Sequence, residues 1–211
     1  MNAEKVLSNL NYLQATYPNY AEVFDDPDYL AMVQSLKEEV ALSAARSAGR
    51  ASRFKAALKF SKQCFNMHKD TRPGFAGAYI DEKGRQCICD GYTAVMYEKP
   101  FAELVEADKD CAHMNLDKSF DYDSRRPVDL PTLAELKTKK KLDKAEGKKR
   151  SLTVIGGHVC YNTDFLIQLV EMVEPTEAYF SGGDRLPALV AIGDGAKGIV
   201  LPVNKPKEEA E

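Results

Sequence analysis

The chain has 211 residues, of which 44% are apolar and 29% are charged, and its formal net charge is −3. This composition is that of a globular protein, and it excludes a disordered chain or a fibre. No apolar run approaches the roughly 18 residues that cross a bilayer, and the first residues lack a secretory signal, so we expect no membrane contact. Five cysteines without paired zinc spacing indicate a reduced, cytoplasmic protein.

The charge is distributed unevenly along the chain. Residues 1–45 carry two basic and seven acidic side chains. Residues 46–72 carry eight basic side chains and one acidic side chain, and residues 137–150 carry eight basic and two acidic side chains. The two basic segments can contact phosphate groups locally although the protein as a whole is acidic. The alternative is that both segments are solvated faces.

Residues 1–48 are predicted to form an acidic helical extension. Val6, Leu10 and Leu13 follow helical spacing, and Asp28 is positioned to cap a second helix. We expect Gly49 to end or kink this helical run. We expect this extension either to cover the main domain or to bind a protein partner.

The main domain is predicted to span residues 49–204. Its first element is a helix that begins at Ser52, with Phe54, Leu58 and Phe65 on the inner face. A separate face of this helix carries the lysine row, which consists of Lys55, Lys59, Lys62 and Lys69.

Beyond Pro73 the apolar period changes to two, which predicts strands. Three strands are expected over residues 74–98, with a tight turn at Lys83 and Gly84. Next come a polar stretch with a basic loop at 137–150, which we expect to be a mobile or frayed helix, and a strand pair at 151–162. A helix capped by Asn162 or Thr163, three strands over residues 177–203, and a disordered tail at 205–211 complete the chain.

The order of a helix followed by three strands therefore occurs twice. Together with several short motifs it resembles one domain of the DNA sliding clamp family, the bacterial polymerase III beta-subunit family, over about residues 50–203. The resemblance implies an α+β fold, a DNA-clamp-like domain built from two strand–helix–three-strand units, here with an N-terminal helical extension. The motifs that carry it are SRFKAALKFSKQC, GRQCICDGYTAVMYE, HVCYNTDFLIQLVEMV and LPALVAIGDGAKGIVLPV.

The sequence also departs from that family in three respects. Bacterial clamps have three such domains in each chain, whereas this chain has room for one, and its N-terminal helices have no clamp counterpart. Both helices of a clamp domain face DNA and carry basic groups. Here the second helix has an acidic outer face, which we expect to repel a phosphate backbone, formed by Asp164, Gln168, Glu171 and Glu174.

Two sets of basic residues are candidates for contact with double-stranded DNA. Ammonium groups spaced by about one helical turn can follow a row of phosphates without reading bases. The first set is the lysine row together with Arg50 and Arg53. The second set is a candidate basic arm made of Lys139, Lys140, Lys141, Lys148, Lys149 and Arg150. For each set, the alternative is a solvated surface.

No pattern in the sequence indicates an active site. Cys87 and Cys89 share one face of a predicted strand, but further zinc ligands at suitable spacing are missing, unless pairs from other strands assemble with them. Cys64 and His68 lie one helical turn apart without the third group that catalysis needs. We therefore predict a non-enzymatic protein with no catalytic residue, no metal and no cofactor.

Two hypotheses follow from these patterns. The first is a DNA-associated clamp-like protein, a processivity or docking factor in DNA replication, encoded by a phage or mobile element and assembled as a homo-oligomer through unpaired strand edges. The second is a protein-interaction module on a clamp-like scaffold. It would use the acidic residues of segment 1–45 to bind and regulate a nucleic-acid enzyme, as a phage inhibitor of host defence would.

Overall fold

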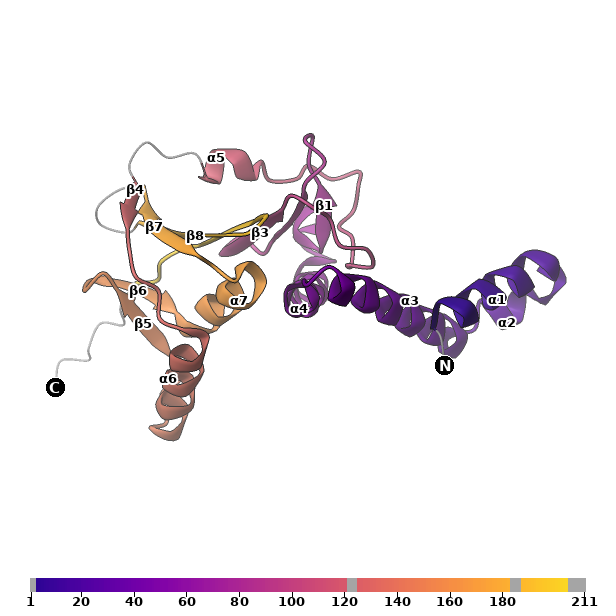
Figure 1. The fold of residues 1–211 in the computed structure, drawn as a ribbon, viewed down its shortest axis with the longest axis horizontal. Helices are drawn as coiled ribbons and strands as arrows, with labels where there is room; N and C mark the ends of the chain where they lie inside the picture. The colour runs from indigo at the N-terminus through magenta and orange to yellow at the C-terminus, as the bar shows by residue number, and fades with distance from the viewer. Residues whose placement is uncertain (1–2, 121–124, 183–186, 205–211) are drawn as a thin grey trace. The chain divides into compact units, whose positions relative to one another are not determined.

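The computed structural model describes residues 3–120, 125–182 and 187–204. The chain divides into two compact units, one of residues 1–55 with 101–103 and the other of residues 56–100 with 104–211 (Figure 1). The division falls inside a helix, after Lys55. The predicted disordered tail, 205–211, lies outside the described residues.

The first unit is built from helices. Asp26, not Asp28, caps the long third helix: its Oδ1 accepts hydrogen bonds from the backbone N–H groups of Asp28 and Tyr29, at 2.9 and 3.1 Å. Pro27 then occupies the first helical position, where its missing N–H costs nothing. The helices are α1 (Ala3–Thr16), η1 (Pro18–Tyr20), α2 (Ala21–Phe24) and α3 (Pro27–Ser47), and α1 packs against α3.

Gly49 ends α3, as the sequence predicts. Its φ of 70° is a left-handed conformation that favours glycine. The N–H of Arg50 donates to the carbonyl of Ala45 and that of Gly49 to the carbonyl of Arg46, at 2.7 and 3.0 Å. These two bonds form a Schellman motif, which satisfies the last carbonyls of the helix and turns the chain into α4 (Ala51–His68).

The inner face of α4 differs in part from the prediction. Phe54 is buried as expected, but Phe65 is 39% exposed. Small side chains, Ala57, Ser61 and Cys64, occupy the buried positions instead, at helical spacing from Phe54. The prediction was wrong at Phe65 because it assigned the core side of the helix from the largest apolar residues.

The second unit is α+β, which confirms the predicted class. Its main sheet has seven strands in the order β1-β2-β3-β9-β8-β7-β4, and all neighbouring strands are antiparallel. The strands are β1 (Ala78–Ile80), β2 (Gln86–Cys89), β3 (Thr93–Tyr97), β4 (Arg125–Pro127), β7 (Glu177–Ser181), β8 (Ala188–Gly193) and β9 (Ala196–Val200). The remaining elements are η2 (Pro73–Phe75), α5 (Leu116–Phe120), α6 (Leu133–Ala145), α7 (Thr163–Val173) and the hairpin of β5 (Leu152–Ile155) and β6 (Val159–Asn162).

The predicted repetition is present in the order of elements. α4 precedes the meander β1–β3, and α7 precedes the meander β7–β9, and the two meanders meet where β3 pairs with β9. The halves differ in what precedes the helix. Strand β6 leads into α7, whereas helix α3 leads into α4, so only the second half is a strand–helix–three-strand unit.

Both faces of the seven-stranded sheet are covered (Figure 1). On one face, α7 packs so closely on β9 that a Cβ at Gly198 would collide with Leu169 and Val173. On the other face, Leu116 and Phe120 of α5 join a buried cluster with alternate strand residues such as Met96. Burial on both sides explains why β3 is apolar at nearly every position.

Candidate nucleic-acid interface and adjoining pocket

Most of the predicted basic loop is an ordered helix. Residues 137–145 belong to α6, which starts in a capping box: Thr132 Oγ1 accepts from the N–H of Glu135, and Glu135 Oε2 accepts from the N–H of Thr132, at 3.3 and 2.7 Å. Leu136 is almost fully buried. A local cap and one buried apolar contact therefore hold much of the lysine-rich segment as a regular helix, where we predicted a loop with a mobile or frayed helix.

α6 packs against α7 and places a lysine beside two of the three carboxylates on its acidic face. Lys137 Nζ lies 2.7 Å from Glu171 Oε1, and Lys140 Nζ lies 2.5 Å from Asp164 Oδ1. These are two of the carboxylates that we expected to repel a phosphate backbone. Because each has a lysine beside it, the outer side of α7 is far less negative than the sequence of α7 alone indicates.

Two further lysines of α6 have no acidic side chain beside them in the described part of the chain. Lys141 and Lys144 are exposed, and neither has an ion-pair partner within residues 3–120, 125–182 and 187–204. Exposed ammonium groups of this kind can exchange counterions for the phosphates of a nucleic acid. α6 therefore adds net positive charge beyond the charge it uses to neutralise α7.

The lysine row is exposed along α4 and its C-terminal turn. Within the second unit, Lys59 and Lys62 are exposed, and Lys69 follows the helix with its Nζ 5.7 Å from the centre of the Phe65 ring. In the first unit, Lys55 is also exposed. α4 and α7 contact each other directly, since Gln168 Nε2 donates a hydrogen bond of 2.8 Å to Gln63 Oε1.

The two arginines assigned to the lysine row lie differently. Arg53 is only 8% exposed, so its charge is directed into the protein. The guanidinium carbon of Arg50 lies 4.0 Å from the centre of the Phe101 ring, and Phe101 also packs against Phe54. Both arginines belong to the first unit and help to build it, and the exposed cations of α4 are the lysines.

Near the C-terminal end of α6, a buried carboxylate organises the start of β5. Lys148 Nζ and Ser151 Oγ donate to Asp143, at 2.9 and 2.6 Å, and Lys139 Nζ lies 3.1 Å away. Hydrogen bonds from Lys148 and Ser151 hold the pKa of Asp143 well below its usual range. Ser151 Oγ is in turn 2.8 Å from the hydroxyl of Thr163, the first residue of α7. The cluster thus fixes the chain between α6 and β5.

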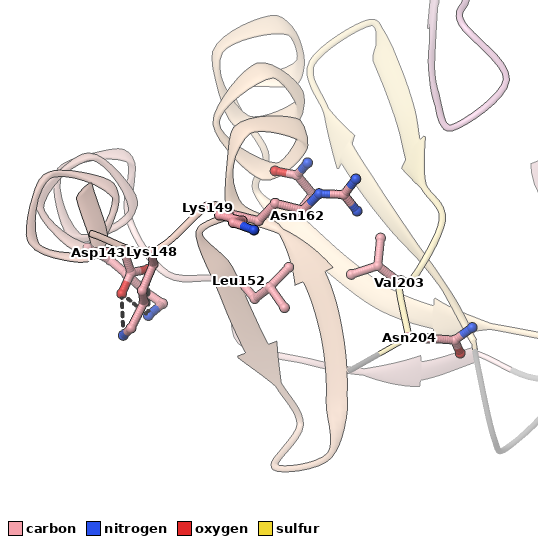
Figure 2. Close-up of a pocket in the computed structure, with 9 residues that line it drawn as sticks. Asp143, Lys148, Lys149, Leu152, Asn162, Val203 and Asn204 are labelled. Carbon is pink, nitrogen blue, oxygen red and sulfur yellow. Dashed lines mark hydrogen bonds and ion pairs between the residues drawn. The ribbon is translucent and has the colours of Figure 1, made fainter. Parts of the chain in front are cut away.

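An open pocket of about 760 Å³ adjoins this cluster. Figure 2 shows the side chains of Leu152 and Val203 facing each other across it, while Lys148 turns toward Asp143. We call it the α6–β5 pocket, and its lining is Lys139, Asp143, Lys148, Lys149, Arg150, Leu152, Asn162, Val203 and Asn204. Four of the six residues of the predicted basic arm therefore line one pocket, and Lys140 and Lys141 remain on α6.

The thiols and imidazoles form no metal site among the residues that the structure describes. Cys87 and Cys89 are buried in the sheet, and burial raises the pKa of their thiols to about 12 and about 11. The ring of His113 stacks on Tyr79 at 4.5 Å. Cys64, paired with His68 by spacing, is buried, and burial raises its pKa as well. These side chains pack within the fold.

No protein family, no curated protein and no solved structure matches this chain. Among the helices of the described residues, none is both long and apolar enough to cross a bilayer.

Proposed function

We propose that the chain is a non-enzymatic, DNA-associated protein that contacts the phosphate backbone of duplex DNA through α4, α6 and α7. The observation that carries this proposal is the pairing of Lys137 with Glu171 and of Lys140 with Asp164, which removes the main electrostatic objection. With these carboxylates compensated, α4 and α6 supply exposed positive charge through Lys59, Lys62, Lys141 and Lys144.

A clamp-like architecture supports the same function. Each half of the second unit has one helix followed by a three-strand meander, and the two helices are hydrogen-bonded to each other through Gln63 and Gln168. DNA sliding clamps resemble this arrangement in having two helices on the DNA-facing side of each domain. In this proposal the protein acts in DNA replication as a processivity or docking factor.

Self-association through β4 completes the proposal. β1 and β4 are the two edge strands of the sheet, and β1 is partly covered because Ala78 exchanges backbone hydrogen bonds with Val105 and Ala107. β4 has β7 as its only partner within the described chain, so its outer edge offers backbone groups to a second copy. Analytical ultracentrifugation should therefore detect a homo-oligomer.

The test of DNA binding is fluorescence anisotropy of a labelled blunt duplex over a range of salt concentrations. We expect binding that weakens steeply with salt, because each neutralised phosphate contributes about 0.9 to the logarithmic slope. The double variant Lys141→Glu, Lys144→Glu should lower affinity and reduce the slope by about 2. A matched control is Lys118→Glu, since Lys118 is an exposed lysine of α5 on the other face of the sheet.

Two results would contradict the proposal. One is an absence of duplex binding even at low salt. The other is an equal loss of affinity in the α6 double variant and in the Lys118 control, because non-specific attraction would then account for the binding.

The surface of the first unit supports a second function, which is binding of a protein partner. Around the turn between α1 and α3 it exposes a group of apolar side chains, Tyr12, Leu13, Tyr17, Tyr20, Val23, Leu30 and Met32. Tyrosine is enriched in protein interfaces, and the acidic excess of this segment fits a basic partner. We infer that this surface binds a basic protein segment, as the second hypothesis requires.

The chain lacks tryptophan, so intrinsic tyrosine fluorescence can test docking with a synthetic basic amphipathic peptide. We expect a saturable signal that weakens in Tyr17→Ser, Tyr20→Ser. The control is Tyr92→Ser, since Tyr92 is an exposed tyrosine of the second unit. Equal weakening in both variants would contradict docking at the first unit.

A further inference from the structure

We propose that the α6–β5 pocket binds a nucleotide, with the phosphate at Lys149 and Arg150 and the base against Leu152 and Val203. This inference goes beyond duplex binding and does not depend on it. The pocket lies wholly within the second unit, between the end of α6, the β5–β6 hairpin and the chain after β9.

The charges around the pocket favour a phosphate. Lys149 and Arg150 are exposed, and neither has an ion-pair partner in the parts of the chain that the structure describes. Asp143 is the carboxylate of the lining, but Lys148, Lys139 and Ser151 already engage it. A bound anion therefore meets two unengaged cations and a carboxylate whose charge is compensated.

The floor of the pocket favours an apolar, flat group beside that phosphate. Leu152 and Val203 are half-buried and face each other (Figure 2). The backbone at Val203 is fixed, because its N–H donates to the carbonyl of Cys160 on β6, at 2.8 Å. Inorganic phosphate alone would leave this apolar surface uncovered, whereas a nucleotide base would cover it.

Two side-chain amides supply the hydrogen bonds that a base edge can use. Asn162 caps α7 with its Oδ1, which accepts from the N–H of Asp164 at 2.9 Å, so its amide NH₂ group is available as a donor. Asn204 is exposed at the opposite rim of the pocket. A volume of about 760 Å³ lies within the range of small-molecule sites and exceeds what a single phosphate needs.

The nucleotide bound in the pocket can come from two sources. It can be a free nucleotide, or it can be an unpaired nucleotide at the end of a DNA strand. The first measurement is isothermal titration calorimetry of the full chain with deoxyadenosine 5′-monophosphate, deoxyadenosine and inorganic phosphate as separate probes. We expect the nucleotide to bind with a dissociation constant between about 10 µM and 1 mM. Each of the other two probes should bind about tenfold more weakly or not at all, because each lacks one half of the contacts.

Variants assign the binding to the pocket. The double variant Lys149→Gln, Arg150→Gln removes two exposed charges and should weaken nucleotide binding about tenfold or more. Lys118→Gln is the matched control, because Lys118 is an exposed lysine of α5 that does not line the pocket. Leu152→Ser tests the base contact, with a thermal melt to check folding. If Leu152→Ser fails to fold, the deoxyadenosine and phosphate probes still test that contact.

A second measurement separates the two sources by comparing a blunt duplex with the same duplex carrying one unpaired nucleotide at its 3′ end. Tighter binding of the extended duplex, lost in Lys149→Gln, Arg150→Gln, identifies the strand end. Equal binding of the two duplexes, together with binding of the mononucleotide, identifies a free nucleotide. The proposal is overturned if the mononucleotide does not bind, if phosphate binds as tightly as the nucleotide, or if Lys118→Gln weakens nucleotide binding as much as the pocket variant.

Discussion

Replacing Asp143 with asparagine removes the charge around which the end of α6 and the start of β5 are arranged. The carboxylate accepts a 2.6 Å bond from Ser151 and a 2.9 Å bond from Lys148, and Lys139 lies 3.1 Å away. The bond from Ser151 is sheltered and charge-assisted, worth about 1.5–3 kcal/mol, whereas the half-exposed lysines add less because solvent screens their charge. Asparagine keeps one carbonyl acceptor, so we expect Asp143→Asn to lower the free energy of unfolding by about 2 kcal/mol.

Urea denaturation at pH 7 followed by circular dichroism measures this loss, and a shift of about 4–8 °C in the melting temperature should accompany it. The control is Asp164→Asn, because Asp164 is half-exposed and pairs only with Lys140 at the surface. The control should cost less than about 1 kcal/mol.

The dependence on pH gives a second test of Asp143. Its pKa is lower in the folded protein than in the unfolded chain, so the stability it contributes is fully present above about pH 3.9. That contribution is lost progressively as the pH falls from there toward the folded-state pKa. The stability difference between the wild type and Asp143→Asn should therefore shrink below about pH 4. Equal stabilities at pH 7, or a difference that persists unchanged to pH 2.5, would refute the reasoning.

Three further results are expected. Gly193→Ala should lower the free energy of unfolding by about 1–3 kcal/mol, measured by urea denaturation, because the new Cβ would collide with the backbone carbonyl of Val173. A variant as stable as the wild type would show that the backbone moves to accommodate the Cβ without cost. Asp26→Ala should cost about 1 kcal/mol of helix stability by thermal circular dichroism, and no change would argue against the cap. Ellman's reagent should react quickly with one thiol, that of half-buried Cys111, since the other cysteines are buried. A fast phase that survives in Cys111→Ser would contradict this assignment.

The features that were predicted correctly are local ones. The turn at Gly84, the end of α3 at Gly49 and the cap of α7 by Asn162 each depend on a few adjacent residues, and the structure confirms all three. The class of the fold was also predictable, because the apolar period changes from helical to two beyond Pro73. Patterns within a short window were sufficient for these features.

The incorrect predictions concern features that depend on tertiary packing. The lysine-rich segment 137–150 was predicted from its charge to be a loop with a mobile or frayed helix, although the capping box at Thr132 and Glu135, just before it in the sequence, indicates a regular helix. The prediction that Arg53 belongs to an exposed row was also wrong. Whether a long basic side chain is buried depends on its tertiary neighbours, which the sequence does not show.

The α6–β5 pocket could not be predicted at all. Leu152 and Val203 are far apart in the sequence, and only the folded chain brings them to the same cavity. No motif or spacing in the sequence links the two residues.

The pairing of β3 with β9 has a consequence for how this chain folds during synthesis. β3 ends at Tyr97 and its partner begins at Ala196, so the two meanders join only after almost the entire second unit has left the ribosome. Until then the edge of β3 lacks its native neighbour and is open to wrong pairing with other nascent chains. Contacts of such long sequence separation slow folding. The last strand of the sheet therefore sets the time during which a cell must protect the unfinished protein from aggregation.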